Sequence, residues 1–424
     1  MIEPEYLRHV VERLESFRSH PLGFRVAGTP EERAATAFIA AEFRAAGLTD
    51  VVEEPVPVDA WRFQDAFVEL QDGQRFEAAS FGGVPETGAS GVTGELVHVG
   101  RGGRKQLDRV DVRGKIVLVD WLVQRLWPYH VGLELGLRGA AAMIATSPRG
   151  GPYYQADGAL GSFDGIWHER GVPCVTIRRE DAATLTRATG ARVRLVLDAP
   201  CGPAEAANVV GVLSGTQDGA PAIVGGHHDG WFGAAFDDAS AVAITLALAH
   251  ELAAGEPPAQ PIVFVSHTAE EYGIARSAYD WCYGAWYQIV ETHRDWSTDA
   301  RFYLNLEGCG RPDPFTVDTP PELERWARRL CASAARDGLL PHGFRIARPT
   351  TWTEVWPFVA AGVPGMNVST FTTAFDRTEY HTQYDTSDRI DFDYLARLAR
   401  VCARFLREAD AGAADELEFD RRAR

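Results

Sequence analysis

The segment 30–46 has apolar residues at intervals of three and four, the period of a helix with one buried face. Thr29 stands in the N-cap position, Pro30 and Glu32 follow in the first turn, and Gly47 follows the last turn. The apolar positions are Ala35, Phe38, Ile39, Phe43 and Ala46. We therefore expect a helix, followed over 51–58 by an edge strand that contains two prolines.

Between residues 61 and 200 the pattern changes to short apolar runs separated by glycine clusters. This pattern is typical of strands joined by turns, with few helices. The expected strands are 116–119, 141–144, 172–177 and 193–197. We interpret residues 61–200 as a smaller β-rich domain inserted into a larger domain that is formed by 1–60 and 201–424.

After residue 208 apolar strands alternate with loops and helices. The expected strands are 222–224, 262–265 and 302–304, and the expected helices are 240–254 and 392–408. This alternation predicts an α/β fold with a mostly parallel central sheet that is flanked by helices on both faces. A chain of 424 residues exceeds what one hydrophobic core usually serves, which agrees with two domains.

Polar residues directly after these strands are candidates for a ligand site, because ligands bind at the carboxyl ends of parallel strands. His227 follows the first strand, Glu270 and Glu271 follow the second, and Glu307 follows the third. Asp237 lies in the loop before a helix, where its ordinary interpretation is an N-cap. All of the strand ends are expected to open onto one rim.

Taken together with a histidine in a late polar loop, these residues suit metal ions. Imidazole and carboxylate ligands without cysteine favour zinc, with cobalt or manganese as alternatives, at an open catalytic site. Two histidines and three carboxylates are too many for one tetrahedral ion, but they fit two ions with a bridging carboxylate and a shared water. We expect two Zn²⁺ ions per chain, with Asp237 as the bridge, and these ligands: His227, Asp237, Glu271, Glu307 and His381.

Two further residues complete the predicted site without binding metal. Glu270 and Glu271 are adjacent and point to different sides, so we assign Glu271 to the metal and Glu270 to proton transfer as a general base. Asp229 is spaced to orient the imidazole of His227. His228 also fits the ligand position, but in an extended segment it projects to the opposite side.

The order of these motifs resembles the two-zinc aminopeptidase and glutamate carboxypeptidase family, metallopeptidase family twenty-eight. The family pattern is His-x-Asp, Gly-Ala-x-Asp-Asp-x-Ser, Glu-Glu-x-Gly, Asn-Leu-acid and a late His before Asp-Thr. All five occur in order between His227 and Thr386, with one glycine replaced. The resemblance implies a zinc exopeptidase fold of the phosphorylase/hydrolase-like type. It also implies two ligand groups that share a carboxylate: His227, Asp237 and Glu307, and Asp237, Glu271 and His381.

The inserted segment 61–200 looks like the protease-associated domain of several family members, through residues 114–119 and 171–175. The chain also departs from the family pattern. Glu307 stands where aspartate is more frequent, and Ala234 and Ala241 replace glycines. Arg276 replaces the glycine before a serine, and Thr353-Glu354 stands in place of a Ser-Asp pair. These departures affect the expected substrate pocket more than the ligand set.

An aminopeptidase that releases N-terminal residues is the leading hypothesis. It needs a carboxylate for the substrate ammonium group, which the acids of the metal site or Glu354 would supply. Tyr380, next to His381, is a further candidate for substrate binding. Several aromatic residues would either line an apolar pocket or belong to the core: Trp352, Trp356, Phe358, Phe371 and Phe375.

The alternative keeps the metals but changes the substrate to one with a free carboxylate or an acylated amine, cleaved by a carboxypeptidase or amidase. Such a substrate needs a cation, and the candidates are Arg276, Arg311 and Arg377. A non-catalytic binding homologue is a third hypothesis, which the complete set of ligands and base disfavours. Neither the Gly-x-Ser-x-Gly nor the His-Glu-x-x-His motif of other hydrolases occurs.

Charge and cysteine usage narrow the partners and the compartment. The formal net charge of −17 argues against nucleic acid or an anionic membrane as the main partner. The acidic start lacks the basic and apolar stretch of a secretory signal, and six scattered cysteines without Cys-x-x-Cys favour a reducing environment. We expect a cytoplasmic protein that acts on a peptide or small amide, and the sequence leaves a homo-oligomer open.

Overall fold

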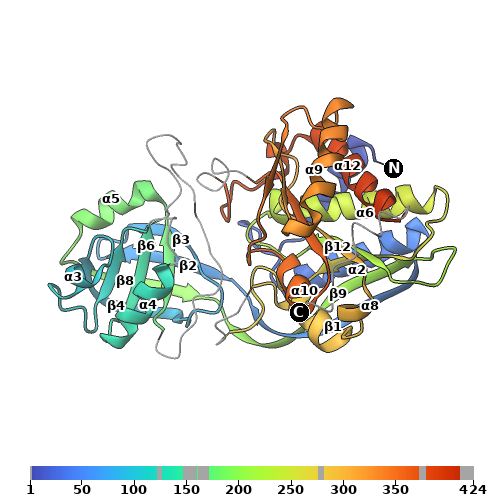
Figure 1. Cartoon of the computed structure of the whole chain (residues 1–424). Coiled ribbons are helices and arrows are strands. Elements are labelled where there is room, and N and C mark those ends of the chain that lie inside the picture. Colours follow the sequence, from blue (N-terminus) through green and yellow to red (C-terminus); the bar gives the residue numbers. More distant parts are fainter. Residues whose placement is uncertain are drawn as a thin grey trace.

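Two sheets organise the chain in the computed structural model, which describes residues 2–121, 127–146, 160, 171–275, 281–371 and 379–410. The larger sheet has eight strands in this order: β1 (Thr49–Trp61), β9 (Cys201–Leu213), β11 (Ile262–His267), β10 (Ala222–His227), β12 (Phe302–Leu306), β15 (Gly365–Ser369), β13 (Phe315–Asp318) and β14 (Phe344–Ala347). The smaller sheet is a closed barrel: β2 (Asp65–Leu70), β3 (Arg75–Ser80), β7 (Cys174–Ile177), β6 (Ala142–Thr146), β5 (Ile116–Val119), β4 (Gly88–His98) and β8 (Arg192–Asp198). Figure 1 shows the barrel to the left of the larger body.

The centre of the larger sheet is parallel. Strands β11, β10, β12 and β15 run in the same direction, whereas β9 pairs antiparallel with both β11 and β1 at one edge. At the other edge β13 is antiparallel to β15 and parallel to β14. The expected α/β fold is confirmed, with its parallel strands in the middle, and the predicted strand over 51–58 is the inner part of the longer edge strand β1.

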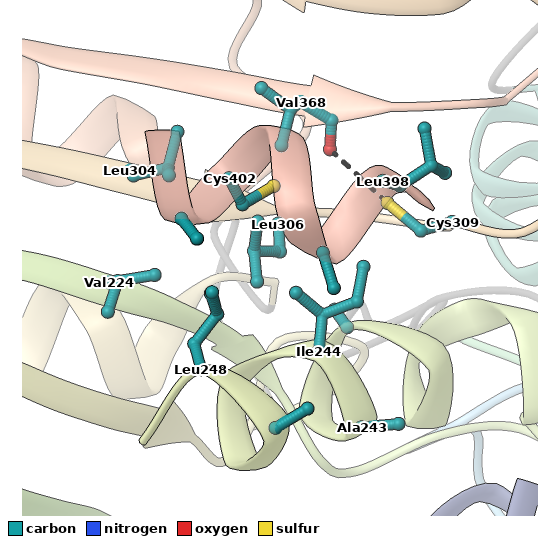
Figure 2. Close-up of a cluster of buried hydrophobic side chains, with 14 of the residues drawn as sticks. Val224, Ala243, Ile244, Leu248, Leu304, Leu306, Cys309, Val368, Leu398 and Cys402 are labelled. Atoms are coloured by element: carbon teal, nitrogen blue, oxygen red, sulfur yellow. Dashed lines mark hydrogen bonds between the residues drawn. The ribbon is translucent and has the colours of Figure 1, made fainter. Parts of the chain in front are cut away.

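Successive strand residues point to opposite sides of this sheet, so its buried strands present an apolar face on each side. Helices cover both faces. Val224 and Leu304 face one apolar cluster, and their neighbours Ile223 and Tyr303 face another. The first face is covered by α1 (Pro4–Glu15), α2 (Pro30–Ala46), α6 (Ser240–Ala253), α9 (Pro321–Arg336) and α12 (Phe392–Asp410). The second is covered by α7 (Tyr283–Tyr287), α8 (Trp296–Asp299) and α10 (Val355–Ala361). Figure 2 shows α6 and α12 side chains meeting strand residues in the first cluster.

Helix α2 begins and ends as its sequence predicts. The Thr29 hydroxyl accepts a hydrogen bond from the amide of Glu32 at 3.3 Å, and Gly47 adopts φ 89° after the last turn. The preceding helix α1 was not predicted, although a proline in its first turn and buried apolar residues at helical spacing support it. Among the described residues no helix is both long and apolar enough to pass through a membrane.

The barrel lies within the predicted inserted segment and leaves the larger sheet through an antiparallel ribbon. Trp61 at the end of β1 pairs with Cys201 at the start of β9, so the chain enters and leaves the barrel at neighbouring positions. Its short helices are α3 (Arg104–Leu107), α4 (Trp127–Leu137) and α5 (Arg179–Arg187). Gly82 and Gly83 bring a barrel loop against the larger body, since a Cβ on Gly83 would lie 2.7 Å from the Tyr272 hydroxyl.

Replacing Phe264 tests how much the first apolar cluster stabilises the parallel strands. Its ring is fully buried on β11, the strand that precedes Glu270 and Glu271, and packs near Phe43 of α2. Replacement by alanine should lower the free energy of unfolding by about 3–5 kcal/mol, measured by urea denaturation. The control Val52→Ala, on the exposed edge strand β1, should change it by no more than about 0.5 kcal/mol. Equal effects would contradict this account of the core.

Candidate metal centre

Three parallel strands deliver the predicted site residues to one edge of the sheet. Strands β11, β10 and β12 are neighbours, and His227 at the end of β10 pairs with His267 at the end of β11. Because the three strands run in the same direction, Glu270 and Glu271 after β11 and Glu307 after β12 emerge beside His227. The single rim expected from the sequence is therefore present.

Two groups of candidate ligands meet at Asp237. His227, Asp237 and Glu307 each offer one atom, and these atoms lie within 4.8 Å of one another. Asp237, Glu271 and His381 form a second group by the same measure, and all five side chains are buried or nearly so. No further such group occurs among the described residues. The geometry brings together the five residues that the sequence selected.

The two carboxylate oxygens of Asp237 face different histidines. Oδ1 lies 3.3 Å from Nε2 of His227, and Oδ2 lies 3.5 Å from Nε2 of His381. On the outer sides, His227 Nε2 is 3.6 Å from Glu307 Oε1, and His381 Nε2 is 2.8 Å from Glu271 Oε2. A carboxylate with one oxygen in each group is what a ligand shared by two metal ions requires.

The donor set fits divalent metal ions of the zinc type. It consists of imidazole nitrogens and carboxylate oxygens, and the described cysteines contribute no atom to either group. Burial raises the pKa of Glu307 well above its usual range, and the charge of Glu354 raises it further, although His227 lowers it. For Asp237, burial is outweighed by hydrogen bonds with His227 and His381, which lower its pKa. Cations at this position would offset the crowding of buried acids.

His227 and His228 separate as expected. His228 turns away from the five candidate ligands, and its Nε2 lies 3.0 Å from Oε1 of Glu32 while its Nδ1 lies 3.0 Å from the Ser266 hydroxyl. Glu32 is fully buried and also accepts a hydrogen bond from Thr268 at 3.0 Å. The sequence assigned Glu32 only to the helix start, but it also fixes the strand end on which His227 lies.

Asp229 ties the loop after β10 to the loop after β11. Its Oδ1 accepts a hydrogen bond from the amide of Glu270 at 3.0 Å, and its Oδ2 accepts one from the amide of Glu271 at 3.1 Å. Oδ1 is also 3.4 Å from Nδ1 of His227. The carboxylate predicted to orient one histidine therefore also positions both adjacent glutamates.

Asp385 positions the backbone at Asp237, as Asp229 positions the backbone at the two glutamates. This role was not predicted from the sequence. Its Oδ1 accepts a hydrogen bond from the amide of Phe236 at 2.7 Å, and its Oδ2 accepts one from the amide of Asp237 at 3.1 Å. Burial raises the pKa of Asp385 to about 7, against the lowering effect of these amides. Asp385 is the aspartate of the Asp-Thr pair in the last motif, and this was the sequence signal that could have indicated the role.

Asp238 is buried beneath the ligands and does not cap α6 as a standard N-cap residue. The peptide bond between Asp237 and Asp238 is cis, within the irregular turn η1 (Ala235–Ala239). Oδ1 of Asp238 accepts hydrogen bonds from the amides of Ala241 at 3.3 Å and of Gly308 at 3.1 Å. Asp238 therefore connects the start of α6 with the residue after Glu307.

Glu270 lies at the rim with one oxygen held by a thiol. Cys282 Sγ donates to Oε1 of Glu270 at 3.1 Å, and Oε2 lies 3.9 Å from Nε2 of His227. Burial raises the pKa of the Cys282 thiol well above its usual range, and the charge of Glu270 raises it further. Burial likewise raises the pKa of Glu270, with His227 opposing and Glu307 adding to the shift.

A cavity of about 120 Å³ opens onto these groups. Its walls combine carboxylates with aromatic rings, and no basic side chain lines it within the described ranges: Asp237, Glu270, Glu271, Trp281, Glu307, Thr351, Trp352 and Tyr380. Trp281 Nε1 donates to the Thr351 carbonyl at 3.0 Å, which links two sides of the cavity. Trp352 is 61% exposed at its edge. The cavity thus suits a small group that carries a positive charge and an apolar part.

Among the described residues, the others predicted to bind substrate are absent from the lining of this cavity. Glu354 is fully buried and accepts a hydrogen bond from Asn305 at 3.1 Å, so it lies beneath the site. Arg311 forms an ion pair with Glu379 at 2.5 Å. Trp356 at the start of α10 is half-buried and is absent from the cavity lining. The predictions for Arg276, Arg377 and Phe375 lie outside the described residues.

Phe358 and Phe371 mainly pack around the site. Phe358 is fully buried and lies 4.4 Å, centroid to centroid, from Tyr303. The ring of Phe371 lies 5.1 Å from that of Tyr380, which in turn stacks on His381 at 3.7 Å. Tyr380 is therefore the residue of this group that both lines the cavity and contacts a candidate ligand.

Ala234 stands at a position where the family pattern has glycine. It adopts φ 47°, in the left-handed region that glycine enters without strain. An alanine is accommodated at some cost in conformational energy, and its carbonyl lies 3.4 Å from the guanidinium of the buried Arg25. The loop that leads to Asp237 thus contains an alanine in a left-handed conformation.

Comparisons with known proteins agree with the fold and the motifs. Residues 208–406 match the model of peptidase family M28. A probable glutamate carboxypeptidase from Arthroderma benhamiae is 30% identical over 166 residues, which are 38% of this chain and 21% of that protein. The matched part thus spans about a fifth of the length of this curated relative.

Solved structures are similar over nearly the whole chain. A zinc aminopeptidase from Bacillus subtilis has a TM-score of 0.78 at 20% identity, over 96% of this chain and 95% of the other. A peptidase M28 precursor from Shewanella amazonensis has a TM-score of 0.74 at 21% identity, over 96% and 97%. The chain therefore shares its fold with these two solved structures. Within this fold, residues 208–406 are the part of the chain that is similar to peptidase family M28.

Asp385→Asn tests the positioning of Asp237. Asparagine offers one oxygen instead of two and brings an amide NH₂ against a backbone N–H, so the loop should lose its geometry. We expect the affinity of the metal-free protein for zinc to fall about 10- to 100-fold, measured by isothermal titration calorimetry. Asp388→Asn, at a largely exposed carboxylate nearby, should bind zinc like the wild type. Unchanged affinity of the Asp385 variant would contradict the assignment.

Proposed function

We propose that the protein is a two-metal exopeptidase that releases N-terminal residues from peptides or small amides. The observation that carries this proposal is Asp237, whose two oxygens face two histidines above a cavity lined by acids and aromatic rings. The names of its relatives, a zinc aminopeptidase and a probable glutamate carboxypeptidase, agree with the reaction class.

The metals would be held by the two groups that share Asp237. One ion would take His227 and Glu307, and the other Glu271 and His381, with Asp237 common to both. When bound, such ions supply electrophilic activation of the scissile carbonyl and of the attacking water. Zinc is the first choice for this donor set, and cobalt or manganese are the alternatives.

Glu270 is the proposed general base. Its Oε1 is engaged by Cys282, so Oε2, on the side of His227, is the atom that would accept the proton of the attacking water. The same atom would return the proton to the leaving amine. Asp229 supports this step by holding the amide of Glu270.

The cavity favours a substrate with a free amine. Its carboxylates would bind an ammonium group, and the indole rings of Trp281 and Trp352 would contact an apolar first side chain. A carboxylate-bearing substrate would need a cation, and Arg311 is already paired with Glu379. An N-terminal amine therefore matches the lining better than a C-terminal carboxylate.

We propose that the barrel is the predicted protease-associated-like domain and packs against the segments that carry Glu271 and His381. The amide of Leu160 donates to Gln383 Oε1 at 3.0 Å, and the amide of Gln383 donates to the Leu160 carbonyl at 3.3 Å. Gln383 lies two residues after His381, and Gly83 contacts Tyr272 just after Glu271. The barrel would thus support two of the three proposed ligands of one metal, Glu271 and His381.

Metal removal and Glu270→Gln test the reaction together. Dialysis against a chelator should abolish hydrolysis, and zinc should restore it, with about two ions per chain by elemental analysis. Glu270→Gln should keep the ions but lower kcat by about 10²- to 10⁴-fold, because the base is lost. Glu322→Gln, at an exposed glutamate of α9, should leave kcat unchanged. Activity that survives complete metal removal would rule out the proposal.

A substrate panel tests which end of the peptide is recognised. Aminoacyl anilides with a free amine and an apolar side chain should be hydrolysed, whereas their N-acetylated forms should not, since acetylation removes the charge that the cavity acids bind. Release of the aniline is followed by absorbance. Cleavage of N-acylated dipeptides without cleavage of free-amine substrates would favour the carboxypeptidase or amidase alternative.

A further inference from the structure

The thiol of Cys282 contacts the proposed base and has no place in the family motifs. Sγ of Cys282 lies 3.1 Å from Oε1 of Glu270, and both residues are buried, with Cys282 fully enclosed. A thiol can donate one weak hydrogen bond, and a carboxylate can only accept. The contact therefore runs from the thiol proton to Oε1.

The backbone holds this thiol in place. The amide of Cys282 donates to the carbonyl of Glu270 at 2.7 Å, and the amide of Tyr283 donates to the carbonyl of Ala269 at 2.8 Å. Gly284 packs so closely against Thr268 that a Cβ would lie 1.9 Å from the Thr268 carbonyl oxygen. Cys282 adopts φ 54°, a left-handed backbone conformation that is uncommon for residues other than glycine. The segment thus has little freedom to move the sulfur away.

The two oxygens of Glu270 consequently have different surroundings. Oε1 has the Cys282 thiol as its hydrogen-bond donor, whereas Oε2 lies 3.9 Å from Nε2 of His227, and the residue lines the cavity. A carboxylate held at one oxygen cannot rotate freely about its last bond. The other oxygen then keeps one direction relative to the ligands.

We propose that Cys282 is a positioning residue that orients the carboxylate of Glu270 so that Oε2 faces the cavity. This inference rests on the proposed function, in which Glu270 accepts a proton from water. The role excludes Cys282 as a nucleophile, because its sulfur is enclosed and turned toward a carboxylate. It also gives a reason for a cysteine in the segment after the Glu-Glu motif.

Cys282→Ala and Cys282→Ser separate the donor from the packing. Alanine removes the donor, and serine keeps a donor of smaller reach, while neither changes the cost of the left-handed backbone, since both carry a Cβ. We expect Cys282→Ala to lower kcat about three- to tenfold with KM within about twofold, and Cys282→Ser to recover most of the loss. The zinc content should stay equal to that of the wild type in both variants.

Cys331→Ala is the matched control, because Cys331 is equally buried but lies in the apolar cluster on α9. It should leave kcat unchanged once thermal unfolding has shown that the variant is folded. Wild-type kcat in Cys282→Ala would overturn the inference. So would equal losses in the alanine and serine variants, or a loss in Cys331→Ala of the same size.

A double-mutant cycle tests the contact without any activity. Unfolding midpoints are measured for wild type, Cys282→Ala, Glu270→Ala and the double variant, all metal-free. The shift caused by Cys282→Ala should shrink when Glu270 is absent, whereas additive shifts would contradict the contact. If the zinc-loaded wild type hydrolyses no substrate, the proposed function fails, and this cycle still decides whether the thiol and the carboxylate interact.

Discussion

Two loops that carry candidate ligands, those of Glu271 and Asp237, are each held by a buried carboxylate that accepts hydrogen bonds from two backbone amides. Asp229 holds the amides of Glu270 and Glu271, and Asp385 holds those of Phe236 and Asp237. Hydrogen bonds to a charged acceptor in a buried setting contribute about 1.5–3 kcal/mol each. These hydrogen bonds therefore help to fix the positions of Glu270, Glu271 and Asp237.

The buried Arg25 supports this group of acids. The guanidinium of Arg25 donates to the carbonyls of His228 at 2.6 Å and Leu14 at 2.9 Å, which joins α1 to the loop after β10. Burial lowers the pKa of Arg25 to about 10, against the raising effect of nearby Asp229 and Asp385, so it stays charged at neutral pH. Because a buried charge needs compensation, the arginine and the carboxylates depend on one another.

The sequence predicted those parts of the site that follow from one strand end or one helix start. The strand before Glu270 and Glu271 and the capping signals of α2 are local patterns, and the structure contains both elements. The contacts of Cys282 and Asp385 join segments that meet only in the folded chain, so no local pattern marks them. The barrel was expected as a β-rich inserted domain, but its closure was not predicted, because closure depends on strand order rather than on hydrophobic spacing. Helix α1 had sufficient signals in its own residues and was missed.

Arg25 and Glu32 lie outside residues 208–406, the part that matches the family, yet both contact the end of β10. Suppose that residues 208–406 were joined to the N-terminal helices of a similar protein. The five candidate ligands would then be separated from Arg25 and Glu32, the two side chains that hold the end of β10. A chimera made at this boundary would keep every recognisable motif and lose the support beneath His227. The N-terminal helices and residues 208–406 therefore form one unit for exchange between similar proteins.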